Sequence, residues 1–213
     1  MENLYICCRS LRSLKGIDNS CISIGRLILN YCDKLQDLNG LPDSVETLRI
    51  EAINGISNLK GCPKQLKKLD IFRCNHLENL IGCPESVENI YLGLLENLSS
   101  LEGCPMQLDC LTIQKCTKLK SLKYISPLIT GDFSVTLTPL VDLSNGPKEV
   151  GGDYCCRQNG LKHLNAQDTV MTGHNKRFSC DAIYNHMDMS RDTIVNILKK
   201  ELPKMNKSIK VSL

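Results

Sequence analysis

Apolar residues recur along most of the chain at a constant step of 21 positions. Three such columns keep one register from residue 24 to residue 171. Their members are Leu38, Leu59, Leu80, Leu101, Leu122, Leu143 and Leu164; Leu35, Ile56, Leu77, Leu98, Leu119, Leu140 and Leu161; and Ile24, Val45, Leu66, Val87, Leu108, Ile129, Val150 and Met171. A repeat of fixed length is typical of a solenoid, in which each coil packs only against its neighbours.

Each repeat predicts a short strand followed by a tight return, and the stretch 66–84 is one of the best-formed copies. Leu69 and Ile71 alternate with polar residues, so we expect a strand that directs both side chains inward. Gly82 permits a tight bend and Pro84 lacks an amide donor, which predicts that Gly-Cys-Pro closes the coil. Twenty-one residues are too few for a strand and a full helix, so the other side of each coil should be extended or a single helical turn.

The same phase predicts about eight coils within residues 1–187, stacked into one parallel sheet. Leu11 and Leu14 fit the columns at the N-terminal end after a shift of 24 positions. The register fails after Met171. We expect one distorted coil in 172–184, where Phe178 and Cys180 echo Tyr154 and Cys156 after a three-residue insertion.

Residues 188–202 have the pattern of a helix. Ser190 is suited to cap its N-terminus, Pro203 to stop it, and one apolar face holds Ile194, Ile197 and Leu198. Because an open solenoid end exposes an unpaired strand edge, we expect this helix to cap the last coil. The final lysines, Lys204, Lys207 and Lys210, are expected in a solvated tail. Residues 188–213 would thus form a capping helix and a basic tail.

The repeat resembles the leucine-rich repeat family, in the variant with Cys in place of Asn at the turn after the strand. The resemblance covers about residues 3–171 and rests on Leu48-x-Ile50, Leu69-x-Ile71-x-x-Cys74, Ile90-x-Leu92 and Leu111-x-Ile113-x-x-Cys116. Ile53 and Leu95 replace the Cys, so the polar ladder of the turn is incomplete. The resemblance implies a parallel β-sheet on a concave face, with few or no helices on the convex side.

A second form of the repeat follows residue 128. The segments Ile129–Val135 and Val150–Asn159 share a Gly-Asp-aromatic motif. They are similar to repeats of bacteriophage and bacterial proteins, which implies a phage or bacterial source but names no activity.

Composition fits a layered aliphatic interior. The chain has 4% aromatic residues, no Trp and 13 Cys, so Leu, Ile, Val and Cys are expected to fill the core. The net charge of +3 requires neither nucleic acid nor a membrane as partner. No stretch approaches the length of a membrane span, and the N-terminus lacks the apolar segment of a signal peptide. We therefore expect a cytoplasmic protein with free thiols, in the host cytoplasm if it is viral.

Cysteine and histidine offer only weak signals for chemistry. Cys62, Cys83 and Cys104 recur at one point of successive coils, where a disulfide or a soft metal is conceivable. The alternative, which we favour, is that the turn needs a small residue beside Pro. A C-terminal group lacks the spacing of a structural zinc site; its members are Cys155, Cys156, His163, His174, Cys180 and His186. No catalytic motif is present, so we expect no enzyme, no cofactor and no metal.

The outward residues of the predicted strands carry the functional signal. They place aromatic groups and Arg together on the concave face, a combination that is enriched in protein interfaces. The residues predicted to bind a partner are Tyr31, Arg49, Asp70, Phe72, Arg73, Tyr91, Leu94, Gln114 and Lys115.

This pattern favours a non-enzymatic protein–protein interaction module with a protein partner. Its similarity to phage repeats suggests a modulator or inhibitor of a host protein. One alternative is a virion or assembly component that self-associates edge to edge, and a second is a thiol-based redox or metal protein.

Overall fold

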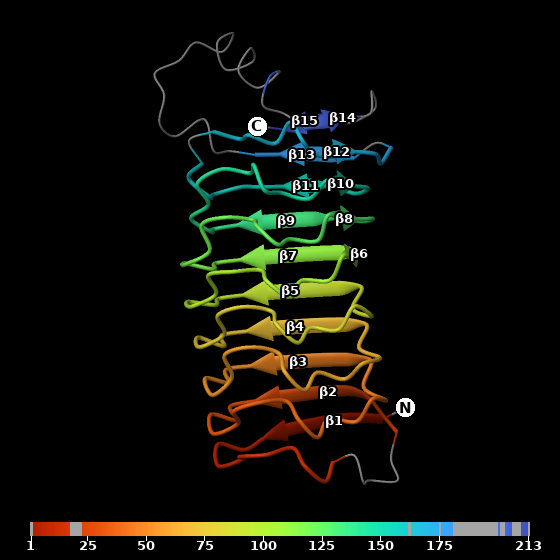
Figure 1. Ribbon diagram of the computed structural model, residues 1–213, viewed down its shortest axis with the longest axis vertical. Helices are drawn as coiled ribbons and strands as arrows, with labels where there is room; N and C mark the ends of the chain where they lie inside the picture. The colour runs from red at the N-terminus through yellow and green to blue at the C-terminus, as the bar shows by residue number, and fades with distance from the viewer. Residues whose placement is uncertain are drawn as a thin grey trace.

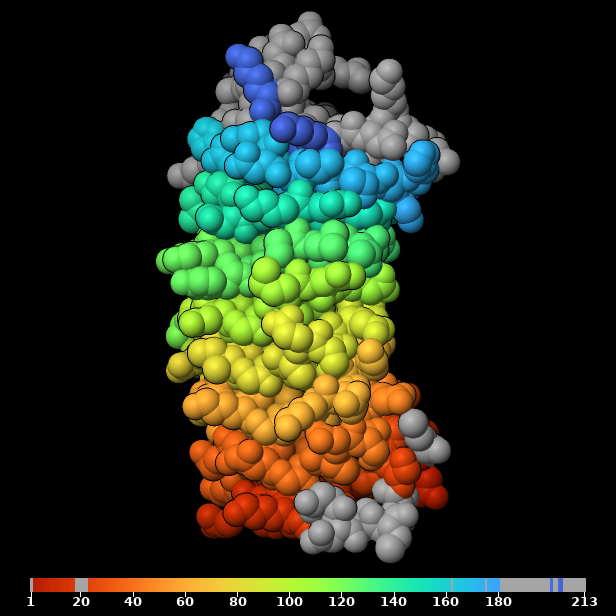
Figure 2. Space-filling view, turned by 45° about the vertical axis from the view of Figure 1, so that its right-hand side comes forward, coloured from red at the N-terminus to blue at the C-terminus, as the bar shows by residue number. Residues whose placement is uncertain are grey.

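The computed structural model describes residues 2–17, 23–161, 163–174, 176–180, 200, 203–205 and 210–212. These residues form a parallel β-solenoid with almost no helix, as the repeat predicts. The coils stack into an elongated column with β1 at one end and β15 at the other (Figure 1). In the space-filling view successive coils lie as thin layers in close contact (Figure 2).

The main sheet contains ten parallel strands among the described residues. In spatial order they are β1 (Glu2–Cys7), β2 (Ile24–Asn30), β3 (Thr47–Glu51), β4 (Lys68–Phe72), β5 (Asn89–Gly93), β7 (Cys110–Gln114), β9 (Phe133–Thr136), β11 (Tyr154–Cys155), β13 (Arg177–Ser179) and β15 (Lys210–Ser212). Each strand between β1 and β15 pairs with the strands of the coils before and after it, so spatial order follows chain order. The sheet therefore runs along the whole column.

A second parallel sheet, with five short strands in the part of the chain that the structure describes, was not foreseen from the sequence. Its strands are β6 (Gln107–Leu108), β8 (Leu128–Ile129), β10 (Glu149–Val150), β12 (Val170–Met171) and β14 (Lys204–Met205). The inward residue of each of its first four strands belongs to the third apolar column. The column was thus recognised and an extended backbone on the return side of each coil was one of the two expectations, but the pairing of these segments into a sheet was not predicted.

The register of the main sheet follows the sequence repeat. Leu48, Leu69, Ile90 and Leu111 are successive partners at a step of 21. One extra residue enters between β7 and β9, where Leu111 pairs with Phe133. Three more enter before β13, where Tyr154 pairs with Phe178, so the predicted three-residue insertion is confirmed.

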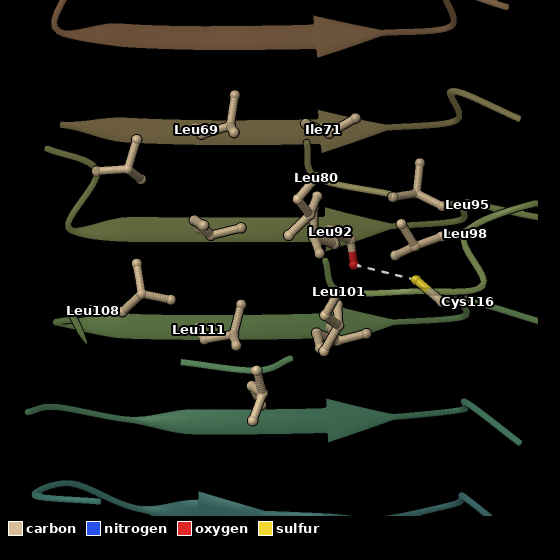
Figure 3. Packing of buried hydrophobic residues seen from close by; sticks show 14 of the residues in the cluster. Leu69, Ile71, Leu80, Leu92, Leu95, Leu98, Leu101, Leu108, Leu111 and Cys116 are labelled. Atoms are coloured by element: carbon tan, nitrogen blue, oxygen red, sulfur yellow. Dashed lines mark hydrogen bonds between the residues drawn. The ribbon is translucent and has the colours of Figure 1, made fainter. Parts of the chain in front are cut away.

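The core of the first coils is aliphatic, as predicted. Leu69, Ile71 and Leu92 are fully buried, and Figure 3 shows such side chains stacked between strands. The prediction of an interior without aromatic rungs is wrong for the last coils. Phe133 and Tyr154 occupy rung positions there, with ring centroids 4.9 Å apart, and Phe178 continues the stack at 5.2 Å from Tyr154. Phe133 and Tyr154 are 21 positions apart, but the extra residue before β9 places them out of step with Leu111 and the earlier members of this column.

Glycine closes the first coils at a point of close approach. Gly40, Gly61, Gly82 and Gly103 all have positive φ, between 90° and 98°. A Cβ atom at Gly82 would lie 2.6 Å from the carbonyl carbon of Leu59 in the preceding coil. The turn therefore requires glycine both for its backbone conformation and for space.

The C-terminal region departs from the sequence prediction. Of the predicted helix 188–202, only Lys200 is among the described residues, so the capping helix lies outside them. Lys204 and Lys210 were expected in a solvated tail, but they belong to β14 and β15. Both strands extend the sheets of the solenoid, pairing with β12 and β13. The repeat pattern does not predict this coil, because the paired residues of its strands and of the preceding coil are 33 to 34 positions apart in the sequence instead of 21.

Candidate functional site

The outward side chains of β3, β4, β5 and β7 form two rows across the main sheet. Because parallel strands in register place equivalent residues side by side, each row follows the strand partners. The first row is Arg49, Asp70, Tyr91 and Thr112, and the second is Glu51, Phe72, Gly93 and Gln114. The rows bring charged and aromatic groups from four coils onto one surface.

Gly93 is the base on which the two aromatic rings rest. A Cβ atom at this position would lie 2.7 Å from Cε1 of Tyr91 and 2.8 Å from Cδ2 of Phe72. The two ring centroids are 6.4 Å apart with an interplanar angle of 31°. A side chain at position 93 would therefore displace both rings, so glycine is what lets them lie against the sheet.

Tyr91 is further fixed through its hydroxyl group, which is 2.9 Å from Oε1 of Gln114 and donates a hydrogen bond to it. Burial, followed by the nearby Cys116 and Asp70, raises the pKa of Tyr91 above its ordinary value. The phenol therefore remains a neutral donor. Since Gln114 comes from the next coil, this bond links β5 to β7 across the face.

The charged groups at this face are mostly paired within it. The Arg49 guanidinium donates to Oε2 of Glu51 from Nη2 at 2.8 Å and from Nε at 3.2 Å. Lys68 Nζ lies 3.9 Å from Oδ2 of Asp70, a longer and weaker ion pair. Two positive and two negative groups therefore meet here, and the face presents polarity without a strong net charge.

A hollow of about 470 Å³ opens beside the aromatic pair. Its lining residues are Arg49, Lys68, Asp70, Phe72, Asn89, Ile90, Tyr91, Cys110 and Thr112. This volume lies within the range of small-molecule and side-chain pockets, which are apolar with a few placed polar groups. The hollow combines an aromatic wall with both signs of charge, so it can receive a side chain that has apolar and polar parts.

Four of the predicted binding residues meet in this hollow: Arg49, Asp70, Phe72 and Tyr91. Two more lie beside it. Gln114 holds Tyr91, and the Arg73 guanidinium lies over the Phe72 ring at 5.0 Å. The binding role itself stays a prediction.

The other predicted residues lie in the turn that follows the strands. Tyr31, Leu94 and Lys115 share a positive φ with Arg73, which places them in one row beyond the strand ends. Tyr31 is 41% exposed and lies near Arg9. It follows β2, whereas the residues that line the hollow belong to β3, β4, β5 and β7. The structure therefore does not bring Tyr31 into the hollow.

Sequence reasoning missed part of the lining. Lys68, Asn89 and Cys110 stand two positions before Asp70, Tyr91 and Thr112, so strand alternation would have placed them on the same face. The role of Gly93 was also missed. A glycine within a strand, next to aromatic residues on the same face, was the available signal.

The turn cysteines are packing residues. Cys74 Sγ donates to the carbonyl oxygens of Phe72 and Ile50 at 3.5 and 3.8 Å, and Cys116 Sγ to that of Leu92 at 4.0 Å, the contact drawn in Figure 3. Burial raises the pKa of Cys74 and Cys116 to about 12. These thiols are therefore neutral at ordinary pH.

The second cysteine column behaves similarly. Cys62, Cys83 and Cys104 pack against the core from half-buried positions, and burial raises the pKa of Cys62 to about 12 and of Cys104 to about 11. The thiols of Cys62, Cys74, Cys83, Cys104 and Cys116 are free. Within the part of the chain that the structure describes, no group of three His, Cys, Asp or Glu side chains is placed to hold a metal ion.

Comparison of the chain with protein-family models, with curated proteins and with solved structures finds no significant match. The described residues also include no helix long and apolar enough to cross a bilayer.

Proposed function

We propose that the protein is a non-enzymatic binding module that holds a partner protein on the outer face of its main sheet, in the manner of leucine-rich repeats. The proposal is supported by the residue types gathered there. Tyr and Arg are enriched among the residues that contribute most to interface affinity, and Phe is enriched in interface cores. The surface consists of strands in continuous register, so little ordering entropy opposes binding.

The observation that carries this proposal is the fixed aromatic pair at the edge of the hollow. Phe72 and Tyr91 lie on Gly93, and Tyr91 is bonded to Gln114. Both rings are only half-buried although aromatic residues make up 4% of the chain. A partner side chain that enters the hollow would meet rings already in position, which is how a preorganised anchor site gains affinity.

The proposed partner is a host protein in a bacterial cytoplasm, where this chain acts as a modulator or inhibitor. This step rests on the similarity of its C-terminal repeats to those of phage proteins. It adds no catalytic role for any residue of the chain.

The test is capture of proteins from bacterial lysate on immobilised wild type and on Phe72→Ala with Tyr91→Ala, followed by mass spectrometry. We expect a specific partner to be retained by the wild type and reduced at least about tenfold by the double variant, since hot-spot truncations cost about 2 kcal/mol or more. Tyr124→Ala is the matched control, because Tyr124 is 53% exposed and lies outside the hollow. Equal retention by the double variant and the wild type would show that this face is not the binding surface.

A further inference from the structure

The strand β1 forms an edge of the main sheet, and no described strand pairs with its outer side. In the following coils, the inward residues, and the residue two positions after the last of them, donate their backbone N–H groups to carbonyl oxygens of the next coil. Examples are Ala52 N to Phe72 O at 2.9 Å and Arg73 N to Gly93 O at 3.1 Å. The same alternation assigns Leu4 and Ile6 to the bonds with β2. Asn3, Tyr5 and Cys7 then direct their N–H and C=O groups to the open edge.

The apolar ladder is also open at this edge. Leu27 and Leu29 of β2 are fully buried, whereas Leu4 and Ile6, their partners on β1, are only half-buried. Tyr5, on the outer face, is 58% exposed. Unpaired backbone groups beside half-exposed aliphatic side chains form a template for another strand.

We propose that a second copy of this chain occupies the edge, with the two β1 strands antiparallel and a two-fold axis at Tyr5. This register pairs Tyr5 with Tyr5 of the other copy and Asn3 with Cys7, so all three outward residues exchange backbone hydrogen bonds. It also places Leu4 opposite Ile6 of the other copy on the inward face. The aliphatic ladder thus continues through the axis, as an isologous interface requires.

Charge favours the same occupant. The antiparallel register brings Glu2, at the start of one β1 strand, to the end of the other strand, where Arg9 follows Cys8. Glu2 and Arg9 are both exposed, so two symmetric opposite-charge contacts form at the rim. The alternative register with the axis at Leu4 would instead put the Glu2 carboxylate opposite Ile6 on the apolar face, which costs desolvation. The dimer uses β1 alone and is independent of the binding face on β3 to β7.

The first test is the mass of the purified full chain by analytical ultracentrifugation. We expect the wild type to form a species of twice 23.8 kDa as concentration rises. Tyr5→Pro should stay monomeric, because proline at an outward position removes no backbone bond to β2. Its thermal midpoint should fall only slightly, since the one bond to β2 that is lost is the exposed hydrogen bond that Asn30 Nδ2 donates to the Tyr5 hydroxyl group. Leu4→Pro is the matched control, and it should lower the thermal midpoint because the bond from its amide to β2 is lost. A wild type that stays monomeric at all concentrations, or a dimer that survives Tyr5→Pro, would overturn the proposal.

The second test fixes the register by cross-linking. Directly opposite residues in a hydrogen-bonded antiparallel pair have Cα atoms about 5.5 Å apart, within the range for a disulfide. Under diamide, Asn3→Cys should therefore give a covalent dimer with Cys7 of the other copy on a non-reducing gel. Adding Cys7→Ser should abolish this dimer, although Cys8 remains. Cross-linking that does not depend on Cys7, or an Asn3→Cys chain that remains uncross-linked while dimeric, would reject this register.

Discussion

The first coils, β2 to β7, and the last coils, β9 to β13, build the same solenoid from different side chains. The first coils use aliphatic rungs, glycine turns and thiols that donate to carbonyl oxygens. The last coils use the Phe133, Tyr154 and Phe178 stack and side-chain polar bonds to the backbone. Asn159 is the central example: its Oδ1 accepts from Thr138 N at 3.0 Å and its Nδ2 donates to Val135 O at 2.8 Å.

The difference shows that the geometry of the coil, and not one residue type, is what the sequence must satisfy. The buried backbone groups of each turn after a strand must be hydrogen-bonded, and the inward side chains of each coil must fill a given volume of the core. The buried backbone groups of the turn can be paired by a thiol that makes weak hydrogen bonds, as in Cys74, or by an amide that makes two strong ones, as in Asn159. The single residue inserted before β9 marks the change between the two solutions.

The largest expected difference is in the response to alkaline pH. Burial holds the pKa of Cys62, Cys74 and Cys116 at about 12, above the ordinary value of 9.0. The unfolded chain therefore ionises first, and stability that is complete below pH 9 falls as pH rises toward 12. Each such thiol contributes up to about 1.4 kcal/mol per pH unit. Urea unfolding at pH 8 and at pH 10 measures the loss.

The control for this effect is Cys62→Ala with Cys74→Ala. The double variant starts less stable at pH 8 but should lose less stability between the two pH values. A slope unchanged from the wild type would mean that other groups control the alkaline transition.

The next effect concerns the glycine turns. Gly82→Ala should reduce the free energy of unfolding by about 3 kcal/mol or more, because a left-handed backbone is combined with the 2.6 Å approach to Leu59. Gly160→Ala in the last coils is the matched control. Gly160 has φ +68°, and no atom of the part of the chain that the structure describes lies within 4 Å of the added Cβ, so Gly160→Ala should reduce the free energy of unfolding by about 1 kcal/mol. Similar losses in urea titrations of the two variants would contradict the close-approach explanation.

A smaller difference is expected between the two kinds of turn residue. Asn159→Ala should cost about 2–3 kcal/mol, because Thr138 N–H and Val135 C=O are left buried without this partner. Cys74→Ala should cost about 1 kcal/mol, since its thiol bonds are weak and the lost volume is small. Thermal and urea unfolding of both variants would rank the two losses. A larger loss for Cys74→Ala than for Asn159→Ala would argue against the view that the amide stabilises the turn more than the thiol does.

The smallest effect is a gain in stability. The side chain of Tyr154 is fully buried, and its hydroxyl group has no hydrogen-bond partner among the described residues. Tyr154→Phe keeps the ring stack and should raise the free energy of unfolding by about 1 kcal/mol. Tyr91→Phe, which removes a hydroxyl that does donate to Gln114, should instead lower it slightly. A loss of stability in Tyr154→Phe would mean that this hydroxyl has a partner after all.

The sequence predicts the fold better where the repeat step is constant. Columns at a step of 21 define the strands from β2 to β7 and their inward residues because identical coils must present identical rungs. They do not predict β14 and β15, because a longer step separates these strands from β12 and β13. Side-chain alternation similarly finds Asp70 and Tyr91 of the hollow. It does not find that a glycine seats both rings, since this depends on how Tyr91 leans along its strand.

Because the first coils repeat at a constant step, the length of the solenoid is set by the number of its repeats. Adding or removing one whole repeat between β2 and β7 would change the length of the molecule by one strand spacing, about 4.8 Å, and return every rung, turn and hydrogen bond to the same register. A change by any other number of residues would have to be taken up in a turn, as the extra residues before β9 and β13 are, or the strands after it would lose their register. The length of this protein can therefore change in whole steps while its ends and its faces keep their structure.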